Sequence, residues 1–121
     1  MTDRPAAAAT RTPGDDPDET MRLFDLRVTV CEIKGRSVCG MSVGDHFDVR
    51  NSDQLSLPPG QSFCFWAIQS VVPLLAAKMR KLPDSDWLEQ DSIVCCPDPE
   101  EGLLLKIERT REVELRTADL T

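Results

Sequence analysis

Apolar and polar residues alternate most regularly in the segment from Phe24 to Cys31. The apolar positions are Phe24, Leu26, Val28 and Val30, and the positions between them are Asp25, Arg27, Thr29 and Cys31. Because successive strand residues point to opposite faces, this period of two predicts a half-buried β-strand. A shorter alternation over 46–50 predicts a second strand in the same way.

A helical period follows the rigid turn Pro58-Pro59-Gly60. Apolar residues recur there at steps of three and four, namely at Phe63, Ala67, Val71, Leu74, Leu75 and Met79. Such steps place side chains on one face of a helix, and Ser62 is expected to be its N-cap. Pro73 lacks an amide hydrogen and clashes with the preceding turn, so we expect a kink or break at this residue.

Two further apolar runs flank a proline-rich acidic turn. Ile93 to Cys96 and Leu103 to Arg109 lie on either side of 97–102, which predicts a β-hairpin. Val113 and Leu115 are expected to form a last short strand or a loosely packed extension. Strands on both sides of a single helical segment predict an α+β fold, with a small antiparallel or mixed sheet packed against one Pro-kinked helical segment.

The length of 121 residues predicts one domain with one hydrophobic core. Residues 1–20 hold three prolines, four consecutive alanines and a late acidic cluster, so we expect a disordered leader there. The α+β domain is then expected over 21–116, and 117–121 is expected to be a frayed C-terminus. Met1 and Met21 both stay open as the true start.

Charge and segment composition narrow the classes of partner. Twenty-one acidic residues against fourteen basic ones give a formal net charge of −7, which disfavours nucleic acids and anionic membranes as partners. The chain has no secretory apolar region and no stretch of about 20 apolar residues that would span a bilayer. We therefore expect a cytoplasmic protein whose five cysteines are mainly reduced.

Three of the cysteines are candidates for one site. Cys39 is predicted in a loop, Cys64 in the first turn of the helix, and Cys96 at the end of the first hairpin strand. The positive end of a helix dipole stabilises a thiolate, so Cys64 is the candidate nucleophile or acid–base group, with Asp98 as its proton partner. Trp66 is a candidate wall of a ligand pocket that Cys39 and Cys96 would complete.

A metal site is the second interpretation of the same thiols. Cys39, Cys64 and Cys96 could ligate zinc or iron, with His46 as the only histidine available for a fourth position. No pair has the C-x-x-C spacing of such sites. The alternative is that the cysteines pack as small apolar residues, which is the interpretation we adopt for Cys31. Because successive residues of a strand point to opposite faces, only one of Cys95 and Cys96 can easily face the core of the domain.

Four segments of the chain share an order of motifs: Cys39-Gly40-Met41-Ser42-Val43-Gly44-Asp45-His46-Phe47, 59–67, Ile93-Val94-Cys95-Cys96-Pro97-Asp98, and Leu105-Lys106-Ile107-Glu108-Arg109. In these segments the chain resembles a family of small uncharacterised bacterial proteins. The residues that the resemblance carries over are Cys39, Gly44, Cys64, Cys96 and Asp98, with Cys95 matched variably. Pro99 stands where the family pattern has glycine, and the Arg-Pro pair ahead of its last strand is absent.

The resemblance implies that the thiols form one site, and it names no activity. We therefore expect a cysteine-centred site that binds a metal ion or a small ligand. One alternative is a cofactor-free enzyme, such as a cyclase, isomerase or lyase of a biosynthetic pathway, that uses a reactive cysteine. Another is a noncatalytic accessory protein to a larger enzyme, and a homodimer also stays open.

Overall fold

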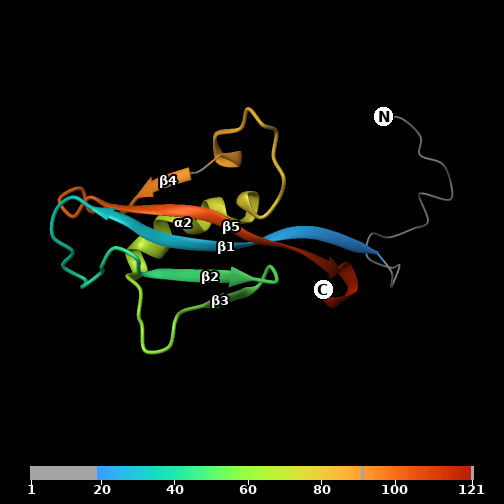
Figure 1. The fold of residues 1–121 in the computed structure, drawn as a ribbon, viewed down its shortest axis with the longest axis horizontal. Coiled ribbons are helices and arrows are strands. Elements are labelled where there is room, and N and C mark those ends of the chain that lie inside the picture. Colours follow the sequence, from blue (N-terminus) through green and yellow to red (C-terminus); the bar gives the residue numbers. More distant parts are fainter. Residues whose placement is uncertain (1–18, 91, 121) are drawn as a thin grey trace.

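The computed structural model describes residues 19–90 and 92–120, which form one antiparallel sheet and one α-helix (Figure 1). The strands are β1 (Thr20–Ile33), β2 (His46–Arg50), β3 (Gln54–Ser56), β4 (Ser92–Cys95) and β5 (Leu103–Arg116), and the helix is α2 (Phe65–Lys78). The predicted α+β class is confirmed. The disordered leader is predicted over 1–20, and 1–18 of it lie outside the described residues.

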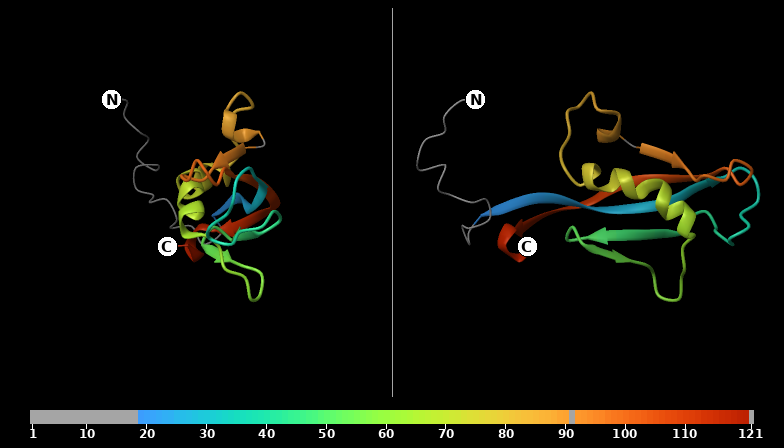
Figure 2. Two further views of the ribbon diagram at one scale, coloured as in Figure 1. Left: turned by 90° about the vertical axis from the view of Figure 1, so that its left-hand side faces the viewer. Right: turned by 180° about the vertical axis from the view of Figure 1, so that it is seen from behind.

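The sheet order is β3-β2-β1-β5-β4, so the two 14-residue strands β1 and β5 form its centre. They pair along nearly their whole length, from Thr20 with Arg116 to Ile33 with Leu103. Helix α2 lies across one face of the sheet, while the far end of the β1–β5 ribbon extends beyond the other strands (Figures 1 and 2). The predicted hairpin is confirmed as the antiparallel pair β4 and β5.

The core lies between α2 and the sheet. Leu26, Val28 and Val30 of β1 are fully buried, and so are Leu103, Leu105 and Ile107 of β5. Ala67, Val71 and Leu75 of the helix complete this layer at the predicted spacing of four. Phe47 of β2 meets Phe63 edge to face, with ring centroids 5.0 Å apart.

Phe24 of β1 is half-buried and packs against the core, as its place in the alternation predicts. The register of β1 against β5 shifts after Asp25, because Thr110 of β5 has no partner on β1. Asp25 is buried, and it lines a polar hollow together with Arg27 and Thr110. The ring of Phe24 lies 4.5 Å beneath the Arg109 guanidinium.

Other element boundaries also differ from those predicted. Cys64, rather than Ser62, is the N-cap of α2, and the helix continues through Pro73 as one element. The second half of β5 contains Val113 and Leu115, which continue the strand instead of forming a separate one. The predicted terminal segment 117–121 contains a 3-10 turn at Thr117–Asp119. No helix in the described ranges is long and apolar enough to cross a membrane.

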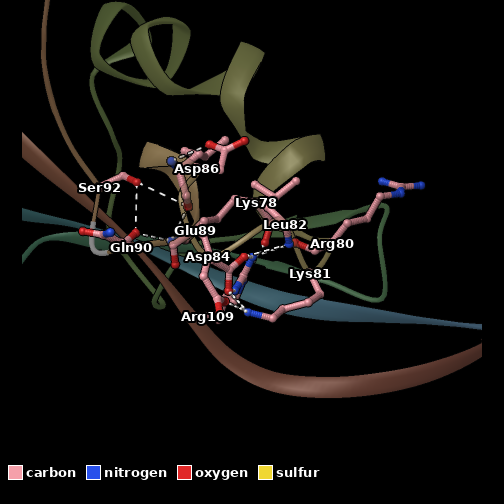
Figure 3. A network of polar contacts seen from close by, with 11 residues as sticks. Lys78, Arg80, Lys81, Leu82, Asp84, Asp86, Glu89, Gln90, Ser92 and Arg109 are labelled. Atoms are coloured by element: carbon pink, nitrogen blue, oxygen red, sulfur yellow. Dashed lines mark hydrogen bonds and ion pairs between the residues drawn. The ribbon is translucent and has the colours of Figure 1, made fainter.

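A polar network fastens the connector after α2 to β5 (Figure 3). Arg109 donates to both carboxylate oxygens of Glu89, at 2.6 and 2.7 Å, and to the carbonyl oxygens of Lys78 and Arg80. The Nζ of Lys78 is buried against the carbonyl oxygens of Leu88, Glu89 and Gln90. These hydrogen bonds fix the connector that delivers the chain to β4.

Candidate thiol site

One cavity of about 260 Å³ collects the candidate residues from three separated segments. It is lined by Val38, Cys39, Cys64, Trp66, Cys96, Pro97, Asp98 and Glu101. The loop after β1, the start of α2 and the β4–β5 turn gather at the same end of the sheet, on the left in Figure 1. The long central strands carry two of these segments to this end, and the helix across the sheet brings the third. We call this cavity the thiol pocket.

The β4–β5 hairpin positions Cys96. Its amide donates to the carbonyl oxygen of Leu103 at 2.9 Å, which closes the turn over 97–102. Cys96 is 5% exposed, whereas Cys95, the last residue of β4, is exposed. The prediction that only one of the two adjacent thiols faces inward is therefore confirmed.

Glu101 holds two of the three thiols. Its carboxylate accepts a hydrogen bond from the Cys96 thiol at 2.9 Å on Oε1, and from the Cys39 thiol at 3.6 Å on Oε2. Glu101 is only 3% exposed. Its backbone is fixed by the amide of Gly35, which donates to the Glu101 carbonyl oxygen at 2.8 Å. The loop after β1 is thereby joined to the hairpin turn at the floor of the thiol pocket.

Both of these thiols are held in the protonated form at neutral pH. Burial, followed by the hydrogen bond to Glu101, raises the pKa of Cys96 to about 11. Burial also raises the pKa of Cys39. The hydrogen bond with Ser37 opposes this shift, and smaller contributions from Cys64 and Glu101 act in the same direction as burial. Since the thiolate is the nucleophile and the metal ligand, these two sulfurs act as hydrogen-bond donors here.

Cys64 and Trp66 come from the start of α2. Cys64 is half-buried, its thiol interacts with that of Cys39, and its amide donates to the Met41 sulfur at 3.4 Å. It stands one residue before the helix, rather than within the first turn as predicted. The Trp66 side chain is 62% exposed at the pocket, and its ring meets Phe65 edge to face. An exposed indole beside a cavity offers an apolar wall to a ligand.

Asp98 lies at the exposed rim of the pocket and orders the turn. Its Oδ1 accepts from the amides of Glu100 at 3.0 Å and Glu101 at 3.4 Å. The Cys96 thiol contacts the backbone oxygen of Asp98 at 3.7 Å. The carboxylate that contacts thiols is thus Glu101, which takes the place expected for Asp98.

The remaining candidates lie elsewhere. Cys31 is exposed, and its thiol donates to the Leu104 carbonyl oxygen, so its expected role as a buried packing residue is wrong. His46 lines a different hollow, together with Arg27 and Arg50, and its Nδ1 lies 3.2 Å from the Gly44 oxygen. Among residues 19–90 and 92–120, no three His, Cys, Asp or Glu side chains are arranged to hold one metal ion.

Sequence reasoning missed Glu101 because an acidic residue in a proline-rich turn resembles a solvated surface position. A usable indication was present in the hairpin prediction itself. Once Cys96 pairs with Leu103, the five residues after Pro97 must return to the strand, and Glu101 is brought back beside Cys96. The acidic residue nearest to the returning strand was therefore a better candidate than Asp98.

Comparisons of this chain with protein-family models, curated proteins and solved structures find no match. The resemblance to the bacterial family stays a prediction, and functional inference depends on the geometry of the thiol pocket.

Proposed function

We propose that this is a cytoplasmic binding protein that takes one small organic molecule into the thiol pocket. The observation that carries the proposal is the convergence of Cys39, Cys64, Cys96 and Trp66 on a single cavity of about 260 Å³. Small-molecule sites are typically concave and mostly apolar, with a few polar groups that fix orientation. The volume of about 260 Å³ lies just below the range of roughly 300–1,000 Å³ for such sites, which favours a small ligand.

The state of the thiols favours binding over the other expectations. Cys39 and Cys96 have raised pKa values, so these two thiols are poor nucleophiles at neutral pH and are better suited to noncovalent recognition. They also donate to Glu101, which occupies them as hydrogen-bond donors. A reducing cytoplasm would keep all three cysteines free of disulfide bonds.

The experiment is a ligand-observed NMR screen of small amines, alcohols and carboxylic acids against the full chain. Val38→Trp should fill the mouth of the pocket, since Val38 lines it and is 70% exposed, so the change leaves the core intact. Val43→Trp is the matched control, because Val43 is also exposed and is not a lining residue. Binding should persist in the control and disappear in Val38→Trp.

Two results would overturn the proposal. One is a screen in which no member of the panel binds, and the other is binding that survives Val38→Trp. Metal analysis of protein purified without an affinity tag covers the remaining alternative. Stoichiometric zinc or iron that is lost on Cys64→Ser would replace the organic ligand by a metal ion.

A further inference from the structure

Glu101 differs from the other buried acidic residues in having no basic partner within the described part of the chain. Three carboxylates are buried in the described chain, namely Asp25, Asp48 and Glu101. Asp48 accepts from Arg27 and Arg50, and Asp25 pairs with Arg111 at 3.1 Å. No salt bridge in the described ranges joins Glu101 to a basic side chain. Its partners are the Cys96 and Cys39 thiols.

Thiols are weak partners for a buried carboxylate. An ionised carboxylate offers about four acceptor positions, and burial without strong compensation is costly. The Cys39 thiol lies 3.6 Å from Oε2, which is a long contact. Glu101 also lines the cavity, and Cys39 and Cys96, whose thiols it accepts from, line the same cavity. A cationic donor in the pocket would supply the charge pairing that Asp25 and Asp48 obtain from arginines.

The walls of the pocket suit the rest of such a ligand. Trp66 is 62% exposed and Val38 is 70% exposed, and both line the cavity that Glu101 closes at its floor. An indole ring attracts cations as well as apolar groups. Asp98 at the rim adds a second negative charge. An anionic ligand would meet two carboxylates and no described basic side chain at the lining of this pocket.

We propose that the ligand of the thiol pocket is a small organic ammonium compound, whose ammonium group donates to Glu101 and whose apolar body packs against Trp66. This inference rests on the proposed function. It narrows the ligand to amines that are protonated at neutral pH. The thiols then act as neutral neighbours that orient the Glu101 carboxylate, and no bond to sulfur forms or breaks.

The test compares three ligands of equal chain length, hexylammonium, hexanol and hexanoate, by isothermal titration calorimetry with the full chain at neutral pH. Hexylammonium should bind at least about tenfold more tightly than hexanol, because a hydrogen bond to a charged group typically changes the dissociation constant by about tenfold or more. Hexanoate should bind most weakly. Trp66 fluorescence, recorded in a Trp87→Phe background, should change with the same midpoint.

Glu101→Gln removes the charge and keeps the shape of the side chain. In this variant the affinity for hexylammonium should fall to that for hexanol, and hexanol binding should be unchanged. Glu100→Gln is the matched control, since Glu100 is an exposed neighbour that does not line the pocket. Val38→Trp should abolish binding of hexylammonium. This result would distinguish binding inside the pocket from nonspecific attraction of a cation to an acidic surface.

The outcomes separate the two proposals. Equal affinities for the three ligands in the unsubstituted chain would overturn the ammonium assignment and leave a binding pocket for neutral molecules. Absence of binding by all three ligands and by the NMR panel would overturn the proposed function itself. The three-ligand comparison uses the unsubstituted chain, so it decides the matter even where Glu101→Gln fails to fold.

Discussion

The Cys96 thiol donates to the Glu101 carboxylate across the β4–β5 turn at 2.9 Å, and both side chains are buried. The negative charge of Glu101 opposes ionisation of the thiol, and burial opposes it further. This pair converts a cysteine at a strand end into a neutral donor. It also places the only thiol-bound carboxylate of the described chain at the floor of the pocket.

Glu101→Gln should lower the pKa of Cys96 from about 11 toward its ordinary value. The fall is expected to be partial, because burial is the larger cause and the substitution leaves it in place. The measurement is the rate of iodoacetamide alkylation against pH, followed for each cysteine by mass spectrometry. Exposed Cys31 and Cys95 serve as internal controls. An unchanged Cys96 profile would contradict the contribution of Glu101 to the pKa of this thiol.

Stability should decline at alkaline pH because of the same thiol. A pKa raised in the folded state means that protonation favours folding, so this stability is complete below pH 9.0, the ordinary pKa, and is lost as the pH rises toward about 11. The difference corresponds to about 2–3 kcal/mol. Urea unfolding across this range should show the decline.

Cys96→Ser should flatten the alkaline decline. The serine hydroxyl stays protonated through this range and can still donate to Glu101. A residual slope from Cys39 is expected, because its pKa is raised as well. Cys95→Ser is the control with an exposed thiol next along the chain, and it should keep the full decline. An equal slope in Cys96→Ser and the unsubstituted chain would contradict this account.

Glu89→Gln should destabilise the protein at neutral pH and have less effect in acid. Hydrogen bonds from Arg109, and then from Lys81, hold the pKa of Glu89 far below its ordinary value of 4.5. Its contribution is therefore present above this pH and is lost progressively as the pH falls below it. Thermal unfolding of both proteins between neutral and acidic pH measures the difference.

Glu112→Gln is the comparison for this acid dependence, because Glu112 pairs with Arg22 on the exposed ribbon, with side chains 51% and 72% exposed. Exposed pairs contribute little to stability. The variant should therefore unfold almost as the unsubstituted chain does at every pH. A Glu89→Gln deficit that stays constant down to acidic pH would show that the network in Figure 3 acts through packing, not through charge.

Gly35→Ala should destabilise the hairpin turn and distort the pocket. A Cβ atom at this position would lie 1.9 Å from the Glu100 carbonyl oxygen, which is backbone and cannot move aside cheaply. We expect a loss of about 2–4 kcal/mol in the free energy of unfolding. Gly40→Ala meets no atom within 4 Å and has only a left-handed backbone, φ +75°, to oppose it. It should cost about 1 kcal/mol, measured by urea unfolding of both variants.

Local patterns predicted several parts of this structure correctly. Strand β2, the β4–β5 hairpin and the buried face of α2 follow from alternation or helical spacing, and these patterns depend only on neighbours along the chain. The residues of the pocket were predicted only in part from the sequence. Cys39, Cys64 and Cys96 were proposed to converge, and they line one cavity, but Glu101 was not among the predicted residues.

The errors arise where distant segments decide. The bulge at Thr110 of β5 is a property of the pairing of β5 with β1, and the alternation within one strand does not record it. Cys64 occupies the N-cap position without a side-chain capping hydrogen bond, although Ser62 is the better capping residue, and Phe63 between them packs against Phe47. Propensity is worth less than such tertiary contacts.

The sequence by itself determined the class of fold, the strand and helix segments with regular periods, and the acidic charge. Only the tertiary structure decided that three thiols share a cavity, that Glu101 is buried between two of them, and that Cys31 and His46 lie elsewhere. The reason is physical. Periodicity records which face of an element is apolar, whereas the charge state and partners of a buried group depend on side chains brought together from far apart in the chain.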